Sequence, residues 1–199
     1  MPTSPAIIWY EEVKSTNDVA RNEISSLDNM SVIAARKQTH GRGQGEHKWS
    51  GASGKSLTFS FVMKMGLDAC DALYLTKAIT HAICSYLADR GIAASVKLPN
   101  DIYVGDRKIC GILIENTVFG KKLEFSIIGI GLNVGQEWFE EWIPNPVSMK
   151  MLTGKDYDIA QEMEHLHKKL VRSASLIMTK DGRTGLDEWF SANSFRLGV

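Results

Sequence analysis

The sequence predicts an α+β fold, in which a mixed, mostly antiparallel sheet has helices packed on a face. Short apolar stretches in the middle of the chain are joined by two-residue turn sequences, the pattern of hairpin strands. Two longer stretches repeat apolar residues with the period of an α-helix. Because strands outnumber helices in the middle and hairpins join them, the α+β class fits best.

The first quarter of the chain predicts two strands, a helix start and a long loop. Residues 7–10 predict a short buried strand, and residues 32–35 predict a second one. Ser15 is placed to cap a helix whose first turn carries Asp18, an acidic residue that the helix dipole favours there. Residues 39–55 are rich in glycine and have no period, so we expect a long loop, and such loops are usually functional or mobile.

A strand and a helix follow the loop. Residues 57–62 alternate in polarity, which predicts a strand with one strongly apolar face. Residues 71–89 then change to the helical period. The apolar stripe of this helix consists of Leu75, Ile79, Ile83 and Leu87. Gly91 is suited to end the helix in a left-handed conformation.

Hairpins and two further helices complete the pattern. Residues 96–98 run extended into Pro99, which breaks the strand. Gly105–Asp106 and Gly120–Lys121 are turns, and the strands predicted around them are 102–104, 109–114 and 123–130. Residues 159–177 predict a helix with Leu166, Leu170 and Ile177 on one side, and 186–190 start a last short helix.

Composition favours one self-sufficient domain over residues 1–199. Lys+Arg and Asp+Glu are 23 each, so the net charge is zero and argues against a general nucleic-acid or membrane-surface binder. Cys70, Cys84 and Cys110 have neither zinc-type nor CxxC spacing, so we interpret them as small apolar residues. The sequence shows no secretion signal and no apolar run of membrane-spanning length, so we expect a cytoplasmic protein.

One apparent phosphate motif fails on inspection. Gly54-Lys55-Ser56 ends like a P-loop, but that motif requires a glycine where this chain has Trp49. It also requires a following helix, whose amides point at the phosphates, and here a period-2 strand follows.

Four other segments set polar residues and glycines among the apolar strands. They are 15–17, 38–44 leading to Trp49, 97–101 continuing through 107–111, and 129–133. Together they suit the joining of a carboxylate to a nucleotide phosphate, because two anions need fixed positive charge and amide donors to meet. Arg42 and Lys108 supply the charge, and we expect all four segments to share one pocket.

Each segment also has an ordinary structural interpretation. Ser15 can be a helix cap only, and residues 99–101 form a good turn sequence. Lys108 can be a solvated edge-strand lysine, and Gly129 and Gly131 can mark a bulge. We expect His81, His165 and His167 to be surface or core residues, and Trp138 and Trp142 to be packing residues.

The order and spacing of these strings resemble the catalytic domain of the biotin–protein ligases. The strings are Ser15-Thr16-Asn17, Gln38-Thr39-His40-Gly41-Arg42-Gly43-Gln44, Lys97-x-Pro99-Asn100-Asp101-Ile102-Tyr103, Arg107-Lys108-Ile109-x-Gly111-Ile112-Leu113-Ile114-Glu115 and Gly129-x-Gly131-x-Asn133. The resemblance is close from Ile8 to about Asn133 and implies a fold like that of class II aminoacyl-tRNA synthetases.

The resemblance also implies roles for individual residues. Biotin contacts would come from Ser15, Thr16, Gln38, Gly41, Thr58, Lys108, Gly111, Leu113 and Gly129. ATP contacts would come from Arg42, Gly43, Gln44, Trp49, Asn100 and Asn133, and Mg²⁺ would be held by Asn100 and Asn133. The catalytic residues would be Lys108, Asp101 and Arg42, and the loop at 41–48 would close over the adenylate.

The implied reaction has two steps. The biotin carboxylate attacks the α-phosphorus of ATP, and a lysine of a carrier protein, such as biotin carboxyl carrier protein, then attacks the adenylate. Lys108 would offset negative charge in both steps, and Asp101 would orient or deprotonate the incoming lysine. The alternatives are a lipoate or octanoate enzyme of the same fold, and a catalytically impaired module that only binds biotin or a carrier protein.

The chain departs from the family pattern at several positions. Gln44 and His47 stand where further loop arginines are usual, and Leu98 stands where tryptophan is usual. The family's C-terminal β-barrel is not expected after the last helix, so we expect low activity or weak ATP binding. Nor do we expect a DNA-binding domain before Ile7, so DNA is not an expected partner. The oligomeric state is left open, with a homodimer as one option.

Overall fold

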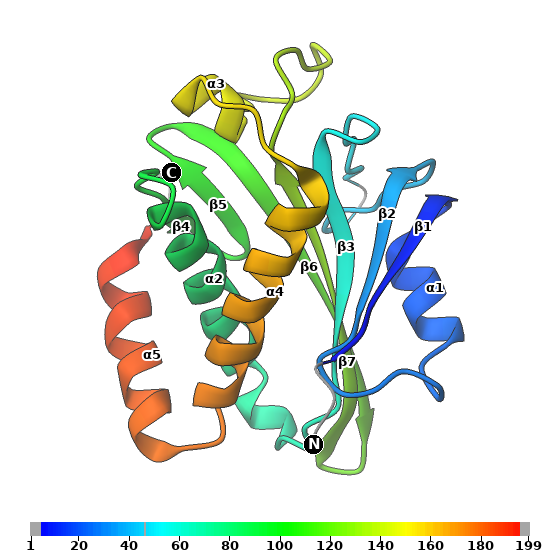
Figure 1. Ribbon diagram of the computed structural model, residues 1–199. Coiled ribbons are helices and arrows are strands. Elements are labelled where there is room, and N and C mark those ends of the chain that lie inside the picture. Colours follow the sequence, from blue (N-terminus) through cyan, green and yellow to red (C-terminus); the bar gives the residue numbers. More distant parts are fainter. Residues whose placement is uncertain (1–4, 46, 196–199) are drawn as a thin grey trace. The chain divides into compact units, whose positions relative to one another are not determined.

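The computed structural model describes residues 5–45 and 47–195 (Figure 1). The chain divides into two compact units, one from Met1–Cys70 and Ile112–Leu132 and the other from Asp71–Gly111 and Asn133–Val199. Parallel and antiparallel strand pairs both occur, and helices pack beside them, so the predicted α+β class with a mixed, mostly antiparallel sheet is confirmed. The prediction of one catalytic domain over 1–199 stays a prediction.

The first unit is built on strands in the order β1-β2-β3-β7-β6. Their bounds are Ile7–Val13 for β1, Val32–Gln38 for β2, Ser56–Met63 for β3, Lys122–Asn133 for β7 and Arg107–Phe119 for β6. Strand β1 runs parallel to β2, and β2 runs antiparallel to β3. The predicted strands are therefore confirmed, and each is longer than expected, although β1 is only half-buried over 7–10.

Strand β3 carries the predicted apolar face, since Leu57, Phe59 and Phe61 are fully buried. Its other face is buried as well, so all eight residues of the strand are buried. A central strand is covered on both sides, and its polar residues Ser56, Thr58 and Ser60 therefore lie inside the unit. An alternating sequence pattern looks the same whether the polar face of a strand is buried or exposed to solvent.

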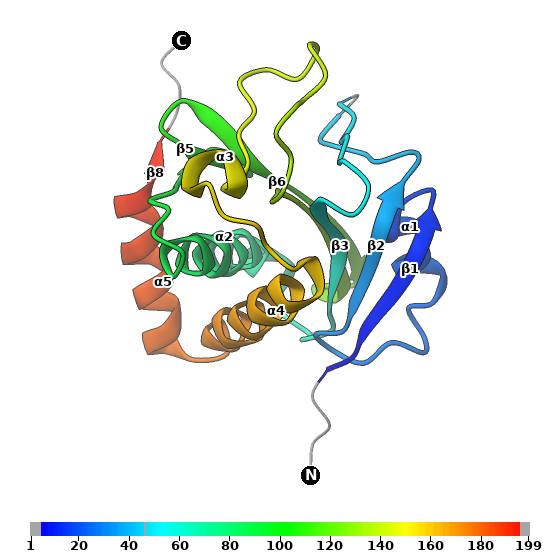
Figure 2. The same ribbon diagram turned by 45° about the horizontal axis from the view of Figure 1, so that its top comes forward.

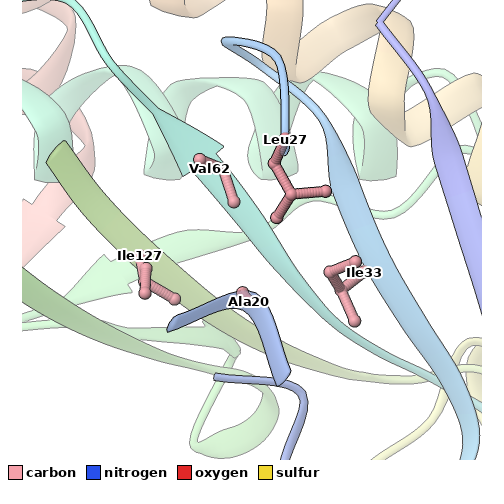
Figure 3. Packing of buried hydrophobic residues seen from close by; sticks show 5 residues of the cluster. All are labelled: Ala20, Leu27, Ile33, Val62 and Ile127. Atoms are coloured by element: carbon pink, nitrogen blue, oxygen red, sulfur yellow. The ribbon is translucent and has the colours of Figure 1, made fainter. Parts of the chain in front are cut away.

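Helix α1 (Thr16–Asn22) packs on β2 and β3 in this unit. Ala20 of the helix contacts a cluster of buried apolar residues from the neighbouring strands and the following loop (Figure 3). The other members of the cluster are Leu27, Ile33, Val62 and Ile127. This packing holds α1 against the strands, and the polar residues 15–17 lie at the N-terminal end of the helix.

The second unit contains a layer of helices, α2 (Leu73–Ala88), α4 (Ile159–Leu176) and α5 (Lys180–Asn193), that pack against one another (Figures 1 and 2). The predicted apolar stripes are confirmed, since Leu75, Ile79, Ile83 and Leu87 of α2 are all buried. Helix α5 begins earlier than expected because the Thr179 hydroxyl caps it by accepting from the Gly182 amide. The short helix α3 (Met149–Thr153) was not predicted.

The strands of the second unit lie in the order β6-β5-β4-β8. Their bounds are Ser95–Lys97 for β4, Asp101–Val104 for β5 and Ser194–Phe195 for β8, and a 3-10 turn spans Ala69–Asp71. The β5–β6 hairpin turns at Gly105, whose φ of 61° is a left-handed value that glycine adopts without strain. The hairpin predicted around Gly105–Asp106 is therefore confirmed.

Two tryptophans contradict the expected packing role. Trp138 is 74% exposed and Trp142 is 55% exposed, because both lie in the irregular segment between β7 and α3.

The histidine predictions are confirmed for His81, which lies edge-on to the Trp189 ring, and for His167, which is buried. No helix in the described part of the chain is long and apolar enough to span a membrane.

We predict that Leu166→Ala will destabilise the protein by about 2–5 kcal/mol, because Leu166 is fully buried in α4 and its loss leaves a cavity. Urea unfolding measures this change. Met178→Ala is the control, since Met178 is 59% exposed and should change the free energy of unfolding by less than about 0.5 kcal/mol. Equal effects of the two substitutions would contradict the assignment of this face of α4 to the core.

Candidate functional site

The N-terminus of α1 is held by a side chain from β2 rather than by its own cap residue. Ser15 has the extended conformation of an N-cap, but its hydroxyl makes no capping bond, so that expectation was wrong. The Gln38 Oε1 atom instead accepts from the Thr16 backbone amide at 2.7 Å and from the Thr16 hydroxyl at 3.0 Å. Gln38 is thereby fixed in orientation beside the first turn of the helix.

Ser60, at the centre of β3, extends this polar group and was not recognised in the sequence. Its Oγ lies 2.8 Å from Thr16 Oγ1 and 2.5 Å from Asn17 Oδ1, and Ser60 is fully buried. The Thr16 and Ser60 hydroxyls have two protons between them for three contacts, namely those to Gln38, to Asn17 and to each other. One oxygen–oxygen contact therefore lacks a proton, and the hydroxyl oxygens keep lone pairs that can accept from a ligand donor.

Three more polar groups of this unit lack a protein partner. The hydroxyls of the buried residues Ser15 and Thr58 have no hydrogen bond within the described residues. Among those residues, Trp49 Nε1 is the one fully buried side-chain nitrogen or oxygen without a partner, which costs about 1–3 kcal/mol. A polar ligand that bonded these groups would satisfy all three.

Gly129 and Gly131 on β7 make room for protein side chains. A Cβ atom at Gly129 would lie 2.7 Å from Asn17 Oδ1, and one at Gly131 would lie 2.1 Å from Trp49 Cε2. The space beside these glycines is therefore occupied by Asn17 and by the Trp49 indole, and the biotin contact expected of Gly129 stays a prediction. Gly41 is also required by close packing, since a Cβ atom added there would lie 2.3 Å from the Trp49 carbonyl oxygen.

Arg42 is held by two carboxylates. Its Nη1 donates to both oxygens of Asp18 at 2.8 and 2.9 Å, and its Nη2 lies 3.4 Å from Glu115 Oε1. The hydrogen bond to Asp18 is the main cause that raises the pKa of Arg42. Glu115 also accepts from Asn17 at 2.9 Å and from Arg21 at 3.2 Å. The Nη1 end of Arg42 is therefore occupied by Asp18, and a phosphate that needed these donors would have to displace that carboxylate.

The loop that carries Arg42 is irregular, as expected. An isolated bridge joins Arg42 to Lys48, and the Gly43 amide donates to the His47 carbonyl at 2.7 Å. Gln44 and His47 are exposed, and Glu46, within the predicted lid at 41–48, lies outside the described residues. The Trp49 amide donates to the Gly41 carbonyl at 3.0 Å, which closes the base of the loop.

Lys108 and Asp101 form an ion pair in the second unit. Lys108 Nζ lies 2.7 Å from Asp101 Oδ1, and Asp101 is opposite Gly111 in the β5–β6 register. The edge-strand interpretation of Lys108 was wrong, because the segment 145–147 covers this end of β6. The Lys108 amide donates to the Asn145 carbonyl at 2.7 Å, and the Val147 amide donates to the Lys108 carbonyl at 3.0 Å.

Asn133 holds the same segment in place. Its Nδ2 donates to the Val147 carbonyl at 3.1 Å, and its Oδ1 accepts from Gln136 Nε2 at 3.1 Å. A buried amide with these bonds fits a structural role and does not fit a Mg²⁺ ligand. Among the described residues, no three His, Cys, Asp or Glu side chains are grouped so that they could hold a metal. The nucleotide contact expected of half-buried Asn100 stays a prediction.

Residues 9–133 match the biotin/lipoate A/B protein ligase family, and this range includes all four segments described above. The chain belongs to this family. Members of this family act on biotin or on lipoate, and the match by itself does not distinguish these substrates.

Individual relatives of this family show the same likeness. Biotin–protein ligase 1, chloroplastic, of Arabidopsis thaliana is 34% identical over 134 residues, which are 64% of this chain and 36% of the relative. The bifunctional ligase/repressor BirA of Escherichia coli is 27% identical over 180 residues, which are 90% of this chain and 55% of the relative. The chain thus spans only about a third to a half of the length of these curated relatives.

A solved structure agrees with these sequence matches. The biotin protein ligase from Aquifex aeolicus in complex with biotin and ATP superposes with a TM-score of 0.71 at 29% identity. The likeness covers 84% of this chain and 69% of that one. The likeness to this family predicted from residues 8–133 is therefore confirmed.

We predict that Gly131→Ala will displace Trp49 and loosen the loop at 39–55, because the added methyl group would overlap the indole ring. Hydrogen exchange measured by mass spectrometry should show exchange in this loop faster by at least about tenfold, a local opening cost lower by about 1.4 kcal/mol. Gly185→Ala is the control, since nothing lies within 4 Å of its added Cβ. Unchanged exchange in Gly131→Ala would contradict the packing of Trp49 on β7.

Proposed function

We propose that this chain activates biotin with ATP to give biotinyl-5'-AMP and then transfers the biotin to a lysine of a carrier protein, such as biotin carboxyl carrier protein. The observation that supports biotin most directly is the group of buried hydroxyls around the N-terminus of α1. Ser15, Thr16, Thr58 and Ser60 belong to it, and together they have more acceptor capacity than protons to fill it.

A ureido ring matches this lining better than a fatty chain does. Its N–H groups can donate to the hydroxyl oxygens, and its carbonyl can accept from Ser15 or Thr58. An apolar chain such as that of lipoate or octanoate would leave these groups buried without partners, at a cost of about 1–3 kcal/mol for each. Gln38, Gly41, Gly111, Leu113 and Gly129 complete the proposed biotin contacts.

The nucleotide would be held through the loop and the residues near it. In the proposal Arg42 exchanges the carboxylate of Asp18 for the ATP phosphates, while Gly43 and Gln44 approach the same groups. A charge-assisted bond to a multiply charged phosphate can replace the existing pair with Asp18. Trp49, Asn100 and Asn133 are the other proposed ATP contacts, with Asn133 acting by keeping 145–147 in place.

Lys108 is the proposed source of positive charge at the reacting atoms. An oxygen of the biotin carboxylate attacks the α-phosphorus and pyrophosphate leaves; the carrier lysine then attacks the mixed anhydride carbonyl and AMP leaves. Negative charge builds on non-bridging oxygens in both steps, so an ammonium fixed beside them lowers both barriers. Asp101, paired with Lys108, would orient that ammonium and accept a proton from the carrier lysine.

Two parts of the proposal rest on the sequence and the general chemistry alone. Mg²⁺ would be held largely by the ATP phosphates, because Asn133 does not fit as a ligand of the ion. Mg²⁺ usually takes only one or two protein ligands when it binds beside phosphates. A cytoplasmic location also stays a prediction.

The deciding experiment is biotin-dependent ATP–pyrophosphate exchange. We expect the chain to catalyse exchange only when biotin is present, and Lys108→Ala to lower the rate by about a hundredfold or more, as the loss of one charge-stabilising donor does in other sites. Lys121→Ala is the control, since Lys121 is exposed in the turn before β7. Absence of exchange, with biotin still bound, would favour a binding module over an enzyme.

Calorimetry separates biotin from lipoate. We expect biotin to bind more tightly, and Thr58→Val to weaken biotin about tenfold while leaving lipoate unchanged, because the substitution keeps the shape and removes one hydroxyl worth about 1–1.5 kcal/mol. Thr184→Val is a control on exposed α5. Tighter binding of lipoate, or an equal loss of affinity for both ligands in Thr58→Val, would favour a lipoate enzyme.

A further inference from the structure

A cavity of about 570 Å³ lies in the second unit, and none of the residues assigned above to biotin or ATP lines it. It is bounded by the C-terminal end of α2, by Tyr157 and by α4. Its size is within the range of small-molecule sites, roughly 300–1,000 Å³. The nature of its lining indicates what it would bind.

The acidic groups of the cavity are already paired. Glu162 is buried, forms an ion pair with Arg90 and accepts from the Tyr86 hydroxyl. Asp89 pairs with Lys169 at 2.7 Å. These two acids and two bases cancel in charge, so neither acid is available to balance a further cation.

Two cations of the lining remain without such a partner. Lys168 and Arg172 make no ion pair or hydrogen bond within residues 5–45 and 47–195. They are four residues apart on α4, so they lie one turn apart on the same side of the helix. The cavity therefore has an uncompensated charge of +2 at its rim.

The floor of the cavity is tied together by several contacts. The Arg90 guanidinium lies 3.8 Å from the centre of the Tyr86 ring, donates to the Tyr86 carbonyl at 3.1 Å and lies 3.0 Å from His165 Nδ1. Burial is the main cause that raises the pKa of Tyr86, so this hydroxyl stays a donor to Glu162. A ligand would meet a fixed surface and would not have to break these bonds.

His81 on α2 lies close to the cations of α4. Its Nδ1 atom lies 2.9 Å from Ser173 Oγ on that helix. Burial lowers the pKa of His81, and the nearby positive charges of Lys169 and Arg172 lower it further, which is the direction expected beside a basic face.

We propose that this cavity is a second binding site, which takes a compact polyanion such as pyrophosphate or a tricarboxylate through Lys168 and Arg172. Two free cations one turn apart at the exposed rim of a cavity suit a small ligand with several charges, because each negative group can meet its own cation. A single monoanion would leave one cation unmatched. The proposal does not depend on the biotin ligase activity.

Calorimetry with inorganic pyrophosphate and, separately, citrate tests the proposal on the full chain. The variant Lys168→Gln/Arg172→Gln removes both free cations. The control Lys155→Gln/Lys180→Gln removes the same charge from two exposed lysines of the same unit. Because all four side chains are exposed, urea unfolding should show the same stability for each protein.

We expect at least one probe to bind the wild type with a Kd below about 1 mM. The Lys168/Arg172 variant should bind about tenfold or more weakly, and the control within about twofold of the wild type. Failure of both probes to bind would overturn the proposal. So would equal weakening in the two variants, which is a general charge effect, or unchanged binding in the Lys168/Arg172 variant, which places the anion elsewhere.

Discussion

The hydrogen bonds from Thr16 to Gln38 Oε1 are the contacts on which the rest of the first unit's polar site depends. They fix the first turn of α1 against β2 through an amide that the helix itself cannot satisfy. Ser60 is within hydrogen-bond distance of both Thr16 and Asn17, and Asn17 donates to Glu115. Through Glu115 the same chain of polar contacts reaches Arg42. The proposed ring pocket and the proposed phosphate arginine are thus held by one connected network.

Glycine allows this network to lie so close to the sheet. Asn17 can approach β7 only because Gly129 has no side chain, and the Trp49 indole can lie on the same strand only because of Gly131. Trp49 in turn closes the base of the loop that carries Arg42. Two glycines spaced by one residue therefore serve the helix and the loop, and the spacing follows from the period of the strand.

The second unit arranges its polar groups by a different principle. Opposite charges are paired at Asp101–Lys108, at Arg90–Glu162 and at Asp89–Lys169, and the first two pairs are largely shielded from solvent. Lys108 gains its position from backbone bonds to 145–147, which Asn133 supports. Lys168 and Arg172 differ from these cations, because neither has an acidic partner among the described residues. Their charges are therefore available to an anionic ligand.

The sequence by itself determined the α+β class, the hairpin at Gly105, the helical stripes of α2 and α4, and the family, because local periods and motif spacing are properties of neighbouring residues. Only the tertiary structure decided that Gln38 and not Ser15 caps α1, that Ser60 is the centre of the polar group, and that Gly129 and Gly131 admit Asn17 and Trp49. These contacts join residues far apart in the chain. Their partners depend on how strands and helices pack, which no local pattern encodes.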